Sequence, residues 1–310
     1  MSRKHLIREP KEEKKRNRIK STLLWSLALV GVCVVWGSGF TIVKIAMSEA
    51  DPIVFVATRF LIATVILTFL SIGRFKKMSW QMAGAGFLLA IPISLGFITQ
   101  TMGLEMTTAS NAGFITGMSV IFTPILASIF LKKKTSLTSM VGVLLATFGL
   151  GFLSLRGKFE VSMGDLLVLV CALMFAIHII LLDRYSNKFD GILLAFFQMA
   201  WVAAIALALS WNRIIGEVSH YSASTLFSVA YLGIFGTAIA YFVQTLAQKS
   251  VSPVSTSLIF QTEVVFTVVF AYFFLHELLS PIQWVGAILI FSGALLCQLA
   301  DINKIKVELN

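Results

Sequence analysis

The chain has 310 residues, of which 57% are hydrophobic and only 13% are charged, with a mean hydropathy of +0.89. These values exclude a water-soluble globular protein and indicate an integral membrane protein. The formal net charge is +10, and because the basic residues gather on one side of the predicted spans, we attribute it to membrane topology and contact with anionic lipid and expect no nucleic-acid partner.

Apolar stretches of about 20 residues, long enough to cross a hydrocarbon core about 30 Å thick, follow one another with short connections. The first is too long for a cleavable signal peptide and is expected to remain in the mature chain. The predicted fold class is therefore an all-α integral membrane protein. Its ten predicted transmembrane helices lie at 22–45, 53–72, 80–102, 108–131, 137–155, 164–183, 191–211, 224–246, 252–275 and 281–300.

The second half of the membrane region repeats the first without a gap at an offset of 144 residues. Residues shared at this offset include Gln100 and Gln244, Phe122 and Phe266, Gly142 and Gly286, and Gly149 and Gly293. A repeat of this kind indicates two copies of one structural unit. We therefore expect a basic tail at 1–21, a first five-helix repeat at 22–155, a second at 156–300, and a tail at 301–310.

The distribution of Lys and Arg predicts the orientation of these helices. Of the 25 basic residues, 20 fall in the N-terminal tail or on the same side of the membrane as that tail, and three fall in the opposite connections. Because basic connections stay in the cytoplasm, we expect both termini there and expect a bacterial plasma membrane. Five helices per repeat is an odd number, so the second repeat must be inverted. The lysines at 132–134 would then face the opposite side from their counterparts at 276–278.

A charged side chain within a membrane helix is costly, so each one is a functional candidate. Glu263 lies about 16 Å into its predicted helix, close to the bilayer midplane. It is expected to bind a substrate amine or to couple protons, or else to be a structural carboxylate held by Arg59 or by hydroxyl groups. For Arg59 we expect snorkelling or pairing with an acid, with binding of a substrate carboxylate as the alternative. His178 either relays protons or donates to a backbone carbonyl of a neighbouring helix.

Neutral polar and aromatic side chains are further candidates for the wall of a central cavity. Gln100 and Gln244 are equivalent in the two repeats, and Asn111 is a third amide within a predicted helix. Such amides can hold a zwitterion without a full charge, or they can simply bridge helices. Trp36 and Tyr241 are candidates for aromatic walls around an apolar or cationic ligand, or for packing residues.

Nothing in the sequence indicates an enzyme. It has no His-Glu-x-x-His, Gly-x-Ser-x-Gly or Gly-x-x-x-x-Gly-Lys motif. Cys33, Cys171 and Cys297 lie in separate predicted helices, too far apart in sequence to suggest a metal site. We therefore expect no enzymatic activity, no metal and no cofactor.

Small residues recur in the fifth and tenth predicted helices. Gly142 and Gly149 lie in the fifth, and Gly286 and Gly293 lie in the tenth. Glycines at such spacing let helices approach closely. They predict tight packing of these two helices against each other or against a second copy of the chain, which leaves a homodimer open.

Several motifs occur in a characteristic order. They are Trp36-Gly37-Ser38-Gly39-Phe40 followed by Lys44, then Arg59-Phe60-Leu61-Ile62-Ala63, and finally Glu263 followed by Phe274-Leu275-His276-Glu277. In this order the chain resembles the ten-helix EamA family of the drug/metabolite transporter superfamily over about residues 22–300. It departs from that family at Lys132–Lys134, where an acidic residue is common, and at Val264, where proline is common. Without that proline we expect no ordinary kink in the ninth helix.

The resemblance implies a secondary carrier of small metabolites, frequently an exporter of an amino acid or a related compound. Inverted repeats independently favour a secondary transporter, in which one half rocks against the other around a midplane site. The expected partners are a small-molecule substrate and the lipid bilayer. The alternative is a receptor or scaffold that uses the same helices without transport.

Overall fold

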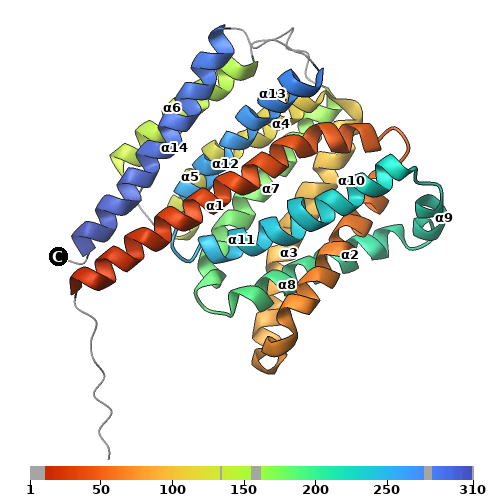
Figure 1. Ribbon diagram of the computed structural model, residues 1–310, viewed down its shortest axis with the longest axis horizontal. Helices are drawn as coiled ribbons and strands as arrows, with labels where there is room; N and C mark the ends of the chain where they lie inside the picture. Colours follow the sequence, from red (N-terminus) through yellow and green to blue (C-terminus); the bar gives the residue numbers. More distant parts are fainter. Residues whose placement is uncertain (1–10, 133–134, 155–161, 276–280, 309–310) are drawn as a thin grey trace, which may run out of the picture.

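The computed structural model describes residues 11–132, 135–154, 162–275 and 281–308. Within these residues the fold is all-α (Figure 1). Nine of the described helical segments are long and apolar enough to cross a membrane, and Leu137–Phe152 is a shorter apolar helix that supplies the remaining span. The predicted fold class is confirmed.

The helices follow the predicted spans in order. The first repeat contains α1 (Lys11–Ala46), α2 (Pro52–Ser71), α3 (Trp80–Met106), α4 (Ala109–Gly117), α5 (Ser119–Phe130) and α6 (Leu137–Ser154). The second contains α7 (Met163–Ser186), α8 (Gly191–Ser210), the short α9 (Ile214–Ser219), α10 (Ala223–Gly233), α11 (Ala240–Ala247), α12 (Pro253–Phe260), α13 (Thr262–Leu275) and α14 (Pro281–Glu308). A 3₁₀ turn, Ile72–Lys77, follows α2, and a π-helical turn, Ile234–Ile239, joins α10 to α11.

The outer ends of the first and last helices were predicted wrongly. The first begins at Lys11 rather than residue 22, and the last continues to Glu308 rather than ending near residue 300. Hydropathy marks where a helix leaves the apolar layer, whereas Lys, Arg and Glu are good helix formers that continue it into water. Glu12 and Glu13 in the first turn of α1 also favour the helix through its dipole.

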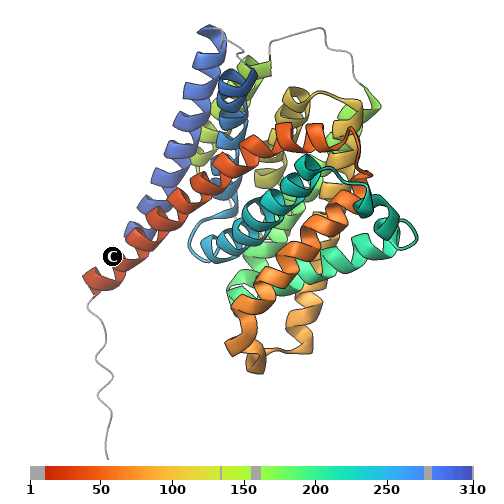
Figure 2. The same cartoon turned by 45° about the vertical axis from the view of Figure 1, so that its right-hand side comes forward.

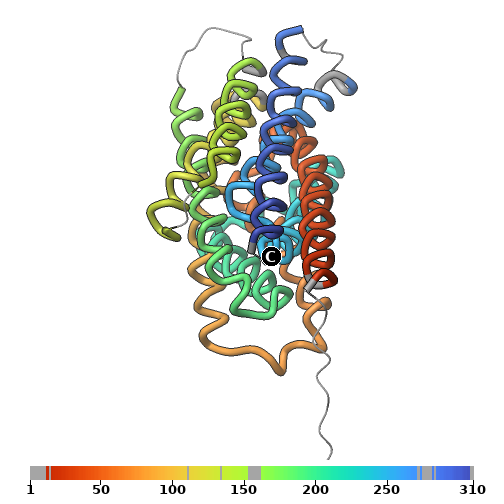
Figure 3. The backbone as a smooth tube through the Cα atoms, turned by 90° about the vertical axis from the view of Figure 1, so that its left-hand side faces the viewer, coloured from red at the N-terminus to blue at the C-terminus, as the bar shows by residue number. Residues whose placement is uncertain are grey.

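The fifth and tenth spans, α6 and α14, run side by side (Figure 3). A Cβ atom added to Gly142 would lie 2.7 Å from the carbonyl oxygen of Gly293, and one added to Gly149 would lie 2.6 Å from that of Gly286. Gly142 thus contacts the repeat counterpart of Gly149, and Gly149 contacts the repeat counterpart of Gly142. A two-fold axis between the repeats produces this pairing. The lower number meets the higher, so the helices are antiparallel and the repeats are inverted. These glycines are used within the chain, and a homodimer stays a prediction.

Other helix contacts also come in pairs, in which swapping the two repeats turns one contact into the other. The first span packs on the ninth through α1 and α13, and the sixth packs on the fourth through α7, α4 and α5. The third packs on the sixth through α3 and α7, while the first lies across the eighth through α1, α10 and α11 (Figure 2). The helices α1 and α14 also touch, and the Ser26 hydroxyl donates to the side-chain oxygen of Gln298 at 2.8 Å. The contrast between residues 132–134 and 276–278 lies largely outside the described residues and stays a prediction.

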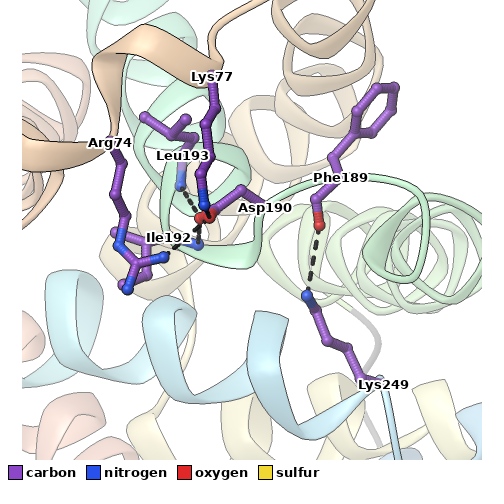
Figure 4. A network of polar contacts seen from close by, with 7 residues as sticks. All are labelled: Arg74, Lys77, Phe189, Asp190, Ile192, Leu193 and Lys249. Carbon is purple, nitrogen blue, oxygen red and sulfur yellow. Dashed lines mark hydrogen bonds and ion pairs between the residues drawn. The ribbon is translucent and has the colours of Figure 1, made fainter. Parts of the chain in front are cut away.

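The second and seventh spans, α2 and α8, are joined at both ends by ion pairs that the repeat exchange also relates. Asp51 caps α2 and lies 3.3 Å from the Arg213 guanidinium, beyond the end of α8. Asp190 caps α8 and lies 2.9 Å from Arg74 and 3.8 Å from Lys77, beyond the end of α2 (Figure 4). Because α2 and α8 pack against each other, the two aspartates hold this helix pair together at its opposite ends.

We expect Asp190 to make the stability of the protein sensitive to acid. Burial acts to raise the pKa of its carboxyl, but the Arg74 guanidinium and the backbone N–H groups of Leu193 and Ile192 outweigh burial and lower that pKa. A carboxyl with a lowered folded-state pKa stabilises the fold above about pH 4 and loses this contribution as the pH falls through the folded-state value. Asp190→Asn keeps the helix cap but removes the charge.

We therefore expect the melting temperature of purified wild-type protein to fall more between pH 7 and pH 3 than that of Asp190→Asn. Asp190→Ala, which loses the cap as well, should be less stable than Asp190→Asn by about 1 kcal/mol at pH 7. Thermal unfolding in detergent, followed by tryptophan fluorescence, measures both differences. An identical acid-induced fall in wild type and Asp190→Asn would show that this ion pair contributes nothing.

Candidate functional site

A cavity lies at the centre of the bundle, between the two repeats. Its walls come from the first, third and fourth spans and from their counterparts, the sixth, eighth and ninth. The second span contributes Arg59 alone among the described lining residues. The cavity therefore lies on the interface that must change if one repeat moves against the other.

Seven of the eight residues predicted to form a site line this one cavity. The eighth, Asn111, belongs to α4, but its side chain lies outside the described residues. The seven come from α1, α2, α3, α7, α11 and α13, which shows that residues scattered over most of the sequence are brought together. Those seven are Trp36, Arg59, Gln100, His178, Tyr241, Gln244 and Glu263.

The fourth and ninth spans are both interrupted beside the cavity. The fourth breaks between α4 and α5, where the Met118 N–H donates to Ile115 at 3.0 Å. The ninth breaks between α12 and α13, where the Gln261 N–H donates to Leu258 at 3.2 Å. Both bonds span three residues instead of four, so each helix tightens locally. The ninth span lacks the proline of an ordinary kink, as the sequence indicated, and a tightened turn at Gln261 interrupts it instead.

These two breaks lie within one residue of equivalent positions, since Met118 separates α4 from α5, Gln261 separates α12 from α13, and Gly117 corresponds to Gln261 at the offset of 144. Interrupted helices at matching positions of inverted repeats are a typical way to build a binding site within a membrane, because the break presents polar groups to the cavity. Here the break presents the side chains of Gln261 and Glu263.

Arg59 is buried, with 5% of its surface exposed, so the expected snorkelling does not occur. Its Nε donates to the Thr237 hydroxyl at 2.5 Å, and its Nη2 donates to the Gly236 carbonyl at 3.0 Å. The guanidinium carbon lies 4.6 Å from the centre of the Phe97 ring. A guanidinium has five N–H donors, and these contacts leave others for a ligand.

The π-helical turn, Ile234–Ile239, explains how Arg59 is held. The wider turn leaves the Gly236 carbonyl accessible from the side, where it accepts from Arg59 and, at 2.8 Å, from the Trp36 indole N–H. Thr237, in the same turn, donates to Leu232 at 2.8 Å and accepts from Arg59. Short π-helical turns are frequent at functional sites because they expose backbone groups in this way.

The opposite chemistry, a set of acceptor oxygens, comes from the eighth and ninth spans. No ion pair or hydrogen bond from the described residues reaches the Glu263 carboxylate, and the predicted pairing with Arg59 within 4 Å does not form in this structure. The side-chain oxygens of Gln244 and Gln261 are buried and have no hydrogen-bond donor among the described residues. A buried acceptor without a donor is costly, so these two oxygens are the cavity-wall acceptors that could still take a donor.

His178 is fixed by a network on the wall of the cavity. Its Nε2 lies 2.8 Å from the side-chain oxygen of Gln198, whose amide nitrogen donates to Leu194 at 3.1 Å and to Thr245 at 3.2 Å. The Gln198 oxygen must therefore accept, so Nε2 of His178 carries the hydrogen and Nδ1 of the neutral ring is an acceptor. The partner is thus a side-chain amide of α8 rather than the expected backbone carbonyl.

The two equivalent glutamines make different contacts. Gln100 donates to the Thr116 hydroxyl at 3.1 Å, across to the fourth span. Gln244 donates to the side-chain oxygen of Gln248 at 3.2 Å within its own span. Gln100 therefore bridges two helices, as the structural alternative expected, whereas the side-chain oxygen of Gln244 has no donor among the described residues.

Aromatic rings form the remaining wall. The Trp36 ring lies 4.9 Å from that of Phe260 and 6.1 Å from that of Tyr241, and Phe97 lies 5.2 Å from Phe175, measured between ring centres. The two predicted aromatic residues thus belong to a larger cluster. With 26 phenylalanines in the sequence, nothing singled out the three that complete it.

Comparison with known proteins shows the same architecture elsewhere. Residues 23–155 and 162–298 each match the EamA-like transporter family. An uncharacterized transporter of Archaeoglobus fulgidus is 33% identical, with 88% of this chain and 85% of the relative covered. The uncharacterized transporter YcxC of Bacillus subtilis is 24% identical, with 86% and 90% covered. A crystal structure with 15% identity and a TM-score of 0.72 covers 91% of this chain and 97% of its own, and it shares the fold.

Proposed function

Since the chain belongs to the EamA-like transporter family, we propose that it is a secondary transporter that moves an amino acid or a related amphipathic compound by alternating access through the central cavity. The observation that carries this proposal is the division of the cavity wall into three kinds of surface. Arg59 supplies donors, Glu263 with Gln244 and Gln261 supplies acceptors, and aromatic rings supply apolar surface.

A zwitterion with an apolar side chain matches all three surfaces. Its carboxylate would accept from the Arg59 guanidinium, which suits planar carboxylates. Its ammonium would donate to the acceptors of the eighth and ninth spans, and its side chain would lie against the aromatic cluster. Binding would then satisfy buried polar groups that the described residues leave without partners.

Alternating access is supported by the contacts that the repeat exchange relates. If two conformations exchange the roles of the repeats, the contacts at one end of the cavity have counterparts at the other, as in inverted-repeat carriers. The α2–α8 pair, held at both ends by ion pairs, would move as a unit.

The orientation of the carrier is the finer part of this proposal. We place both termini in the cytoplasm of a bacterial cell, with the plasma membrane as the location. The bias of Lys and Arg supports this assignment. We propose export as the direction, on the strength of the resemblance to EamA exporters.

Transport by purified protein in liposomes tests the proposed function. Vesicles loaded with unlabelled L-phenylalanine or L-leucine should take up the labelled compound by exchange, with saturation and with competition from the unlabelled form. Protein-free vesicles measure leakage. If correctly folded protein exchanges no amino acid or amine under an imposed proton or sodium gradient of either direction, the proposed function is wrong.

A further inference from the structure

We propose that Gln261 is a substrate-binding residue that selects for an ammonium group, and that Gly117 provides the space its side chain needs. The proposal rests on the proposed function and assigns a role to Gln261, which the sequence did not single out, and a new one to Gly117. It concerns the place where the two interrupted helices face each other.

The carboxamide of Gln261 is enclosed but incompletely bonded. The residue is 1% exposed, lines the cavity, and directly follows α12 at the break in the ninth span. Its side-chain oxygen has no hydrogen-bond donor among the described residues. Buried polar atoms in folded proteins almost always have a partner, and an exception calls for a functional explanation. A ligand in the cavity is the partner that this position allows.

Gly117 lies directly opposite. A Cβ atom added to Gly117 would lie 2.8 Å from the Gln261 side-chain oxygen and 3.0 Å from the Leu150 side chain. Gly117 and Gln261 are also repeat counterparts, so they meet across the axis that relates the two repeats. A side chain larger than hydrogen at residue 117 would occupy the place that the Gln261 carboxamide takes.

The difference between Gly117 and Gln261 breaks the two-fold symmetry at the centre of the cavity. Two equivalent glutamines could not both reach the axis, and two equivalent glycines would leave it without a polar group. Glutamine on one side and glycine on the other make the centre of the cavity asymmetric. An asymmetric ligand such as a zwitterion needs this, because its two ends have opposite hydrogen-bonding properties.

The chemistry of the neighbours identifies which end Gln261 receives. Glu263 lies two residues further along, and Gln244 contributes the second buried side-chain oxygen without a donor. Carboxylate and amide oxygens are acceptors, and an ammonium group carries three N–H donors and no acceptor. A ligand carboxylate would instead be repelled from this wall. We therefore infer that the ammonium group binds at the break of the ninth span.

Three compounds that share a phenyl ring separate the contributions of the two ends. L-Phenylalanine has both charged groups, phenethylamine has only the ammonium, and 3-phenylpropionate has only the carboxylate. Their dissociation constants are measured by titration calorimetry with wild type, Gln261→Met and Gly117→Ala. Methionine has nearly the shape of glutamine but is at most a weak acceptor. Gln298→Met is the matched control, because Gln298 is buried but does not line the cavity.

Gln261→Met should weaken phenylalanine and phenethylamine about tenfold, as expected for loss of one hydrogen bond to a charged group. Binding of 3-phenylpropionate should change less than about twofold, and Gln298→Met should change none of the three. Gly117→Ala leaves Gln261 in the sequence but displaces its carboxamide, so it should produce the same selectivity at about threefold, and it tests the inference even if Gln261→Met does not fold.

The possible failures are distinguishable. If wild type binds the probes, and both variants weaken the binding of all three probes equally or change the binding of none, the role of Gln261 is overturned and the proposed function stands. If wild type binds none of the three, the proposed substrate class and the role of Gln261 are overturned together.

Discussion

Glu263→Gln should reduce the rate of amino-acid exchange at least about tenfold, and it should alter the pH dependence of the remaining exchange. The carboxylate has no hydrogen bond or ion pair among the described residues, so its charge is available to a substrate ammonium or to a proton. Loss of a charge-assisted hydrogen bond within a buried site is worth about a factor of ten or more. Glutamine keeps the shape and removes the charge.

Arg59→Lys should have the smaller effect of the two. Lysine retains a positive charge, and it can still donate to the Thr237 hydroxyl or the Gly236 carbonyl, which now accept from Arg59. It loses the planar, two-pronged geometry that suits a carboxylate. Initial rates of exchange in liposomes between pH 5.5 and pH 8.5 compare the two variants directly.

Glu105→Gln is the matched control for Glu263→Gln. Glu105 lies on the exposed end of α3 and does not line the cavity. The exchange rate of Glu105→Gln should therefore stay within about twofold of the wild-type rate. A correctly inserted Glu263→Gln protein with wild-type rates at every pH would remove Glu263 from the mechanism.

Gly149→Leu should be among the most destabilising single substitutions in the chain, at about 3 kcal/mol. The added Cβ would lie 2.6 Å from the Gly286 carbonyl oxygen and 3.0 Å from the backbone nitrogen of Ile290. Backbone atoms in a packed helix cannot move aside as a flexible side chain can. The helices α6 and α14 would have to separate, and with them the contact that relates the fifth and tenth spans.

Gly151→Leu provides the comparison for Gly149→Leu within the same helix. No atom lies within 4 Å of a Cβ added there, so the change in unfolding free energy should be under about 0.5 kcal/mol. Unfolding of both variants in mixed micelles, as the fraction of denaturing detergent rises, measures the difference. Equal stabilities would mean that the glycine contact does not hold α6 to α14.

The number, order and repeat of the membrane helices were predictable because they depend on long apolar stretches and on residue identities at a fixed offset. Helix ends were less predictable, because charged residues such as Lys11 and Lys306 continue a helix into water, where hydropathy no longer marks it. The gathering of residues as distant as Trp36 and Glu263 followed from the prediction that both repeats face one cavity.

Two features of the site could not be read in this way. The partners of Arg59 depend on a π-helical turn, and no residue of Ile234–Ile239 marks such a turn by its identity. Gln261 was missed because the comparison of the repeats rewarded matching residues, whereas its counterpart Gly117 differs. A signal was present: a polar residue stands opposite a glycine, two positions before Glu263, in a register that the identities of Ile115 with Ile259 and Val120 with Val264 support.

The central claim is that the cavity between the repeats is the path of the solute. Gly113 lines this cavity, and a Cβ atom added there would meet only the Phe40 ring, at 3.7 Å, so a cysteine should fit and face the open space. The three native cysteines are buried, and wild type measures their background reaction.

The decisive measurement is the rate at which a methanethiosulfonate reagent modifies Gly113→Cys in liposomes, with and without L-phenylalanine, followed by the exchange rate of the modified protein. We predict that phenylalanine slows the modification and that the modified protein no longer exchanges amino acids. Modification that is unaffected by phenylalanine and leaves exchange at its original rate would contradict the account.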